Sequence, residues 1–170
     1  MQALAMGGGR FAVSLTALDE PGSAGAEAVA FEVASHPSLP LRPLAKVASG
    51  GELSRISLAI QLVAAKESPV GTLVFDEVDA GIGGAVAETV GRSLKKLGKQ
   101  RQVFCVTHLA QVAAQGDEQW SVSKSGGRGK PQTAVARLDR AGRIEELARM
   151  LGGAEITATT RKHAAELLGK

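Results

Sequence analysis

Glycines, adjacent carboxylates and a histidine stand at three places in the sequence where a nucleotide site could form. Residues 49–52 (Ser-Gly-Gly-Glu) open a stretch with helical spacing, Asp76-Glu77 follows an apolar run, and His108 follows another. Helix N-termini bind anions through free backbone N–H groups, and ligand sites gather at the carboxyl ends of parallel strands. The three features together predict one part of a site that handles nucleotide phosphates.

The first feature is a glycine-rich helix start that has two interpretations. Ser49 followed three residues later by Glu52 is the pattern of a capping box. Capping does not explain Gly50 and Gly51, which cost helix stability in the first turn. Glycines there leave backbone N–H groups open to an anion, which the helix dipole favours. A helix cap and a phosphate contact both stay open on these residues alone.

Two adjacent carboxylates follow the apolar run Thr72–Phe75. A single Asp there would be an ordinary turn residue, but like charges side by side need solvent, a metal or a cation. In P-loop ATPases an Asp that ends this strand helps to hold Mg²⁺. A following Glu is placed to polarise the attacking water as a general base. Asp76 is therefore the candidate metal residue, and Glu77 is the candidate base.

The histidine is informative because of its place in the order of strands. A lone His after a strand is usually a loop or capping residue. His108, however, follows the run Val103–Val106, which is the next predicted strand after Thr72–Phe75. A parallel sheet would bring His108 to the same edge as Asp76-Glu77, where an imidazole could bond a terminal phosphate and sense its presence.

The elements that must position these residues follow from hydrophobic spacing and from Gly and Pro breaks. Strands are predicted at 10–15, 28–33, 72–75, 103–106, 120–123 and 133–138. Helices are predicted at 51–66, 83–97, 109–115, 143–151 and 160–168. The first two strands should form an antiparallel hairpin with a loop at 19–25, and the next two should be buried on both faces of a parallel sheet. Of the helix at 51–66, the face with Leu53, Ile56, Ile60 and Val63 should be buried.

These elements indicate an α/β protein with a mainly parallel sheet flanked by helices and with extra antiparallel strands. At 170 residues the chain has the length of one domain. We expect residues 1–9 to be disordered, 10–34 to be the hairpin, 49–115 to be the core that carries the three features, and 118–168 to be strands and closing helices.

Composition narrows the class of protein. A single cysteine, Cys105, excludes a disulfide framework and a Cys-based metal cluster, and its place in an apolar run predicts an inert thiol. The chain has no apolar run long enough to cross a membrane and no signal-peptide pattern, so we expect a cytoplasmic protein.

The charge of the chain is mildly basic and unevenly distributed. Residues 71–170 carry 15 Lys/Arg against 11 Asp/Glu, whereas residues 1–70 carry 5 against 6. This bias is compatible with DNA, although a solvated surface explains it at least as well. The candidate DNA contacts are Lys95, Lys96, Lys99, Arg101, Lys124, Arg128 and Lys130.

The order and spacing of the three features resemble the C-terminal half of an ABC-type ATPase head, and more closely the RecN family of SMC-like proteins in DNA double-strand-break repair. The likeness is carried by residues 45–55, 75–84, 105–113 and 145–153 and runs from about Arg10 to the C-terminus.

The resemblance assigns a role to each feature. Residues Ser49 to Glu52 would be the signature motif, which contacts the γ-phosphate of ATP bound by the opposite head. Asp76 would be the Walker B residue of the magnesium site, Glu77 the catalytic base and His108 the switch histidine. The resemblance implies ATP and Mg²⁺ as cofactors, ATP hydrolysis as the activity, and a second head and DNA as partners, at the nucleoid and not at a membrane.

Two departures from the family pattern qualify these roles. The sequence has no Gly-x-x-x-x-Gly-Lys-[Ser/Thr], so the Walker A half of the head would be supplied elsewhere, and the chain alone is expected to hydrolyse almost no ATP. The Asp expected in the D-loop falls on Gly83, and Asp79 receives no role.

Two alternatives remain. Residues 76–79 (Asp-Glu-Val-Asp) also resemble the DExD box of helicases, and the basic second half fits a non-catalytic DNA-binding or assembly module.

Overall fold

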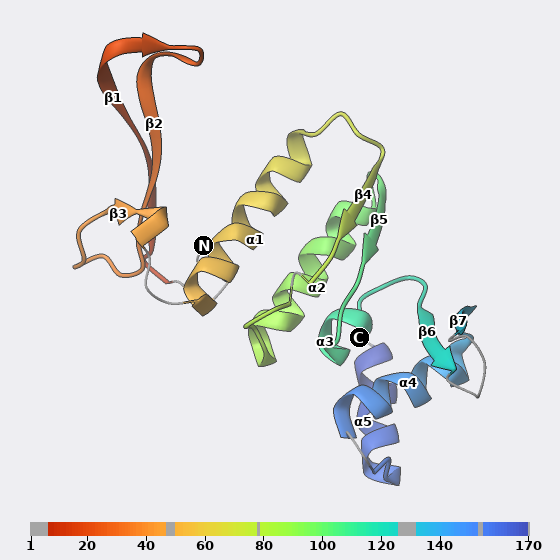
Figure 1. The fold of residues 1–170 in the computed structure, drawn as a ribbon. Helices are drawn as coiled ribbons and strands as arrows, with labels where there is room; N and C mark the ends of the chain where they lie inside the picture. Colours follow the sequence, from red (N-terminus) through yellow and green to blue (C-terminus); the bar gives the residue numbers. More distant parts are fainter. Residues whose placement is uncertain (1–6, 47–49, 78, 126–131, 153–154, 170) are drawn as a thin grey trace. The chain divides into compact units, whose positions relative to one another are not determined.

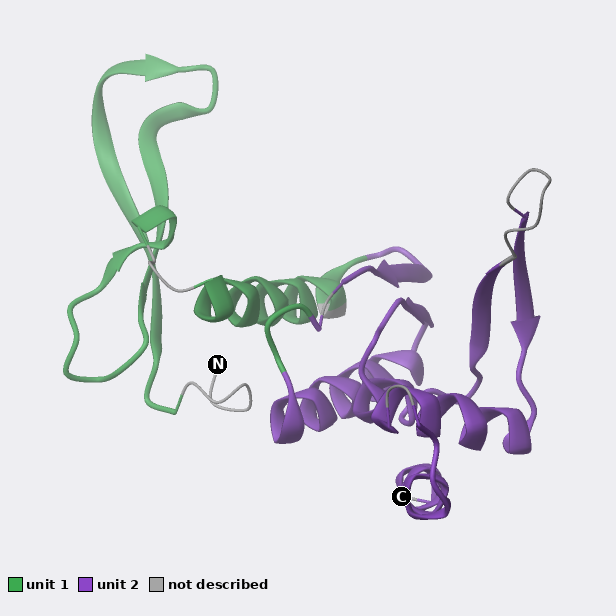
Figure 2. Cartoon of the chain, turned by 60° about the horizontal axis from the view of Figure 1, so that its bottom comes forward, with its two compact units in different colours: residues 1–68, 80–82 green, residues 69–79, 83–170 purple. Residues whose placement is uncertain are grey.

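The computed structural model describes residues 7–46, 50–77, 79–125, 132–152 and 155–169 (Figure 1). They form two compact units, one of residues up to 68 with 80–82 and the other of residues 69–79 with 83 onward (Figure 2). The predicted α/β class is confirmed. One strand pair is parallel, and the other ladders in the described part of the chain are antiparallel.

The first unit begins with the predicted hairpin. Strands β1 (Arg10–Gly22) and β2 (Gly25–Ala34) pair antiparallel, and the short strand β3 (Arg42–Pro43) adds to β2 before the 3-10 turn η2 (Leu44–Lys46). The loop predicted over 19–25 is shorter in the structure, with a turn at 23–24, because β1 continues to Gly22 with a register shift after Ala17. Irregular pairing of this kind accommodates Pro21 without ending the strand.

One face of the hairpin is apolar and largely open. Residues paired across an antiparallel ladder share a face, so Phe11, Val13 and Phe31 lie together, and the rings of Phe11 and Phe31 are 5.6 Å apart. Val13 is nevertheless 54% exposed, and both rings are also exposed. Only the base of this face, at Val33, is buried.

Helix α1 (Gly50–Glu67) completes the first unit and buries a different set of residues from the predicted one. Ile56 and Leu58 are almost fully buried, whereas Leu53 is 42% and Val63 is 62% exposed. The helix carries apolar residues on more than one side, so their spacing does not single out the covered face.

The second unit contains the predicted strand–helix–strand unit. Strands β4 (Thr72–Phe75) and β5 (Gln102–Cys105) pair parallel, with α2 (Gly84–Gly98) as the connection. The apolar residues of α2 recur at helical spacing, and Val90, Leu94 and Leu97 are buried as this spacing predicts.

Burial of β4 and β5 on both faces was a wrong prediction. Phe75 is 5% exposed, whereas Val74 is 68% and Phe104 is 49% exposed. Side chains alternate between the faces of a strand, so the helix packing that covers Phe75 leaves Val74 and Phe104 on the other face. That face is open in the described part of the chain.

The rest of the second unit is built around a small helical core. Helix α3 (Ala110–Ala113) leads to the antiparallel pair β6 (Trp120–Ser125) and β7 (Gln132–Arg137), followed by α4 (Arg140–Gly152) and α5 (Ala158–Leu168). The core consists of Ala110, Ala114, Leu147, Ala148, Ala164 and Leu167.

Both closing helices begin two to three residues earlier than predicted, because polar side chains cap them. The backbone N–H of Gly142 donates to Asp139 Oδ1 at 2.7 Å, and Thr157 forms a capping box with Thr160.

Several predictions fall outside the described residues. They are the disorder at residues 1–6, the helix cap at Ser49, and the basic loop residues Arg128 and Lys130. No described helix has both the length and the apolar character that a membrane span requires.

Candidate nucleotide site

The ends of β4 and β5 meet at one edge of the parallel pair. Phe75 is in register with Cys105, and the backbone N–H of Val106 donates to the Phe75 carbonyl at 2.8 Å. The segments that carry Asp76-Glu77 and His108 therefore leave the sheet side by side, as a parallel arrangement requires.

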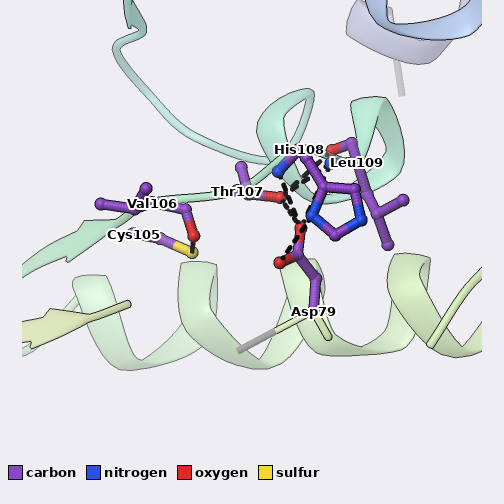
Figure 3. A network of polar contacts seen from close by, with 6 residues as sticks. All are labelled: Asp79, Cys105, Val106, Thr107, His108 and Leu109. Carbon is purple, nitrogen blue, oxygen red and sulfur yellow. Dashed lines mark hydrogen bonds and ion pairs between the residues drawn. The ribbon is translucent and has the colours of Figure 1, made fainter. Parts of the chain in front are cut away.

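A buried carboxylate ties these two segments together. Asp79 is 1% exposed, and its Oδ2 accepts hydrogen bonds from the Thr107 hydroxyl and from the backbone N–H groups of His108, at 2.9 Å, and Leu109, at 3.2 Å (Figure 3). Hydrogen bonds to an ionised acceptor are about twice as strong as neutral ones. They hold the turn after β5 onto the segment after β4.

His108 lies over the other oxygen of the same carboxylate. Its Nδ1 is 3.2 Å from Asp79 Oδ1, while the side chain is 70% exposed (Figure 3). Oδ1 is buried and makes no hydrogen bond in the described part of the chain, and its ion-pair contact there is with the imidazole. The inner ring nitrogen faces protein, which leaves Nε2 for a ligand.

Asp76 and Glu77 have the opposite surroundings. Both are exposed, and neither forms a hydrogen bond or ion pair with another described residue. Glu77 has φ +50°, in the left-handed region, where a residue with a side chain is strained by about 1 kcal/mol or more. The chain accepts this strain at the residue predicted to be the base.

The exposed carboxylate of Asp76, the predicted metal residue, fits a magnesium ion that arrives with phosphates. Mg²⁺ binds hard oxygen ligands and usually takes one or two carboxylates together with waters and phosphate oxygens. Among the described residues no group of three or more His, Cys, Asp and Glu side chains could hold a metal unaided. A Mg²⁺ ion at Asp76 would therefore need phosphate and water ligands to complete its coordination.

The glycine-rich start of α1 makes a close backbone contact. A side chain at Gly51 would come 3.7 Å from the carbonyl of Gly81, which has φ +74° and itself lies against Gly51 and Ser54. Gly50 has open space around its Cα, and the Ser54 hydroxyl donates to the Gly50 carbonyl at 3.0 Å. A Cβ at Gly51 would make only ordinary van der Waals contacts, and Gly50 has open space, so crowding among the described residues explains neither glycine.

The thiol at the end of β5 is electrostatically disfavoured as a thiolate. Burial, then the charge of Asp79 and then that of Asp76, raise the pKa of Cys105 from 9.0 to about 11. The thiol is therefore protonated at neutral pH, in agreement with the predicted inert role.

Three residues that support the site carry no obvious signal in the sequence. Asp79 and Thr107 meet across 28 residues, which no local pattern shows. At Gly91, a side chain would come 2.7 Å from Gln115 Cγ and 3.2 Å from the Gln111 carbonyl, so glycine lets α2 approach the segment around α3 that follows His108.

Comparisons with known proteins find relatives that match most of the chain. No family model matches the chain. The DNA repair protein RecN of Vibrio cholerae is 54% identical over 144 residues, 85% of this chain and 26% of that protein. RecN of Xylella fastidiosa is 50% identical over 167 residues, 97% of this chain and 30% of its own length. The chain is homologous to part of RecN.

The match covers most of this chain but only a part of each relative. The chain spans less than a third of the length of these RecN proteins. Solved structures agree on the fold. An SMC head domain from Pyrococcus yayanosii matches 86% of this chain and 26% of that chain, with a TM-score of 0.67 at 21% identity. A structure from work on ATP-driven dimerization and DNA-stimulated activation of SMC ATPases matches 85% of this chain and 82% of that one, with a TM-score of 0.63 at 23% identity. The chain therefore shares the fold of parts of SMC head domains.

Proposed function

We propose that the chain is the C-terminal part of an SMC-like ATPase head that acts in DNA double-strand-break repair and recombination. The observation that carries the proposal is the shared edge of β4 and β5, where exposed carboxylates and an exposed imidazole follow paired strands. Homology to RecN supports the connection with DNA repair.

Each residue of this edge has a role in the proposal. Mg²⁺ bound with ATP neutralises phosphate charge, and Asp76 would be its ligand from this chain. Glu77, which forms no hydrogen bond or ion pair with another described residue, accepts a proton from the attacking water. His108 presents Nε2 to the terminal phosphate. Residues 49–52 contact the ATP of an opposing head through the backbone N–H groups at the start of α1.

The proposal includes partners outside this chain. The sequence lacks a Walker A loop, so an N-terminal half of the same head would supply it, and a second head would complete the pocket. The chain alone should then bind ATP weakly and turn over almost none. We also propose that the complete protein works on chromosomal DNA in the cytoplasm.

Substitution of the base tests the proposal. In the complete protein, Glu77→Gln should lower ATP turnover at least a hundredfold while ATP binding is retained, because general base catalysis contributes about 10²–10⁴-fold. A suitable control is Glu155→Gln, an exposed residue on the segment before α5, which should leave turnover unchanged. Steady-state ATPase rates and nucleotide binding by fluorescence would be compared.

The possible outcomes test the ATPase head against the assembly module, and also test the split-head arrangement. Unchanged turnover in Glu77→Gln removes Glu77 from the mechanism and contradicts the proposal. Unchanged turnover together with altered DNA binding favours the assembly module. ATP turnover by the 170-residue chain alone contradicts the split-head arrangement.

A further inference from the structure

We propose that Asp79 is the positioning residue for His108. Its buried carboxylate fixes the turn after β5 and keeps the proton of the neutral imidazole on Nδ1, so that Nε2 is the nitrogen offered to the nucleotide. The last step rests on the proposed function, whereas the position of the proton does not.

The burial of Asp79 distinguishes it from the two carboxylates that precede it. Asp76 and Glu77, three and two residues earlier, are exposed, whereas Asp79 is 1% exposed. An ionised carboxylate taken out of water is costly unless it is fully hydrogen-bonded. Asp79 meets this requirement at Oδ2, which accepts all three hydrogen bonds from Thr107, His108 and Leu109, but not at Oδ1.

The second oxygen is what distinguishes a positioning role from a structural one. Oδ1 is buried without a hydrogen bond among the described residues, and the group that it faces is His108 Nδ1 at 3.2 Å. The hydrogen bonds from the backbone N–H groups of His108 and Leu109 fix the position of the His108 backbone. The contact with Oδ1 fixes the orientation of the imidazole ring (Figure 3). Each carboxylate oxygen of Asp79 therefore faces a part of the turn after β5.

An ionised carboxylate can only accept hydrogen bonds, and this fixes the tautomer. A neutral imidazole carries one proton, on Nδ1 or on Nε2, and the nitrogen that faces an acceptor must carry it. Nδ1 faces Asp79, so Nε2 is left without the proton in the neutral ring. In the imidazolium form Nδ1–H remains directed at Asp79, and Nε2–H is the donor left for a phosphate oxygen.

Another histidine of the chain provides the opposite case. The backbone N–H of Ser38 donates to His36 Nδ1 at 3.2 Å, and the Ser38 hydroxyl lies 2.6 Å from the same nitrogen. His36 Nδ1 is therefore an acceptor, which places the proton of the neutral ring on Nε2. The chain thus contains a histidine of each tautomer, and His36 is an internal reference.

The substitution Asp79→Asn tests the proposal because it keeps size and reverses hydrogen-bond direction at one atom. The carboxamide oxygen can accept the three bonds of Oδ2, and the NH₂ group then donates to His108 Nδ1. In ¹⁵N-labelled chain, at a pH where the rings are neutral, the ¹⁵N shifts should show His108 with Nδ1–H in the native protein and with Nε2–H in Asp79→Asn. His36 should keep Nε2–H in both.

A second variant keeps the test informative if Asp79→Asn folds poorly. Thr107→Val removes one donor to Oδ2 and leaves Asp79 in place, so the Nδ1–H tautomer of His108 should persist. In the complete protein, Asp79→Asn should lower kcat for ATP by tenfold or more and change KM less than threefold, whereas Asp117→Asn, an exposed control, should change neither.

The tautomer of His108 and the rate of ATP turnover test the two proposals separately. Nε2–H on His108 in the native chain, or an unchanged tautomer in Asp79→Asn, overturns the positioning role and leaves the proposed ATPase function standing. The expected tautomers with unaltered ATP turnover in Glu77→Gln overturn the ATPase function and leave the role of Asp79 in orienting His108 intact.

Discussion

The three carboxylates that follow β4 are close together in the sequence but have opposite surroundings. Asp76 and Glu77 are exposed and make no hydrogen bond or ion pair with described residues, and Glu77 has a strained backbone. Asp79 is buried and accepts three hydrogen bonds. Groups that must bind an ion or a proton during a reaction have to be uncommitted beforehand, whereas the group that orients them has to be fully committed.

The largest expected contrast is in stability. Asp79→Ala should lower the free energy of unfolding by about 3 kcal/mol, because three donors lose a buried acceptor at about 1 kcal/mol or more each. Asp76→Ala should change it by less than about 0.5 kcal/mol, as an exposed residue does. Urea denaturation of the chain measures both, and equal losses would erase the distinction between the two carboxylates.

The next contrast is in the reactivity of Cys105. With the pKa of Cys105 raised from 9.0 to about 11, its thiolate at pH 8 should be about a hundredfold scarcer than for an ordinary cysteine. A raised pKa favours the neutral thiol, so the rate of alkylation by iodoacetamide should keep rising with pH up to about pH 11 in the folded chain, and level off near pH 9 in urea.

The two carboxylates should also contribute unequally to this reactivity. Asp79 raises the pKa of Cys105 more than Asp76 does, so Asp79→Asn should accelerate alkylation more than Asp76→Asn. The reverse order, measured by mass spectrometry, would mean that the exposed carboxylate dominates the field at the end of β5.

The smallest expected effect is a gain of stability at the proposed base. Glu77→Gly should raise the free energy of unfolding by about 1 kcal/mol, because glycine adopts φ +50° without strain. Glu77→Gln should not, since it keeps a side chain in the same conformation. A loss of stability in Glu77→Gly, measured by thermal unfolding, would show that the Glu77 side chain makes stabilising contacts.

Most elements, but not their environments, could be predicted from the sequence. The spacing of Val90, Leu94 and Leu97 indicated the buried face of α2, because that helix is polar elsewhere. Spacing misled for α1, which is apolar on several sides, and for Val74 and Phe104, whose strands are covered on one face only. Hydrophobic periodicity indicates which side chains are suited to burial. It does not indicate whether the described chain supplies the elements that cover them.

The candidate site was predictable as far as local patterns reach. Asp76, Glu77 and His108 follow strands, and the parallel pairing that brings their segments together is visible in the order of the elements. The contacts of Asp79 could not be predicted, because its partners lie 28 to 30 residues away in the sequence. The hydrogen bonds of a buried carboxylate are decided by tertiary structure, and the residues between these partners leave no periodic trace of them.

The long connection between β4 and β5 also constrains the order of folding. Thr72 pairs with Gln102, so the ladder closes a loop of about 30 residues, and closure has an entropic cost before any contact compensates it. Contacts this distant along the chain form late relative to helices. Asp79 and His108 must therefore wait for the crossover to close, and the proposed sensor is assembled only in chains whose βαβ unit is already complete.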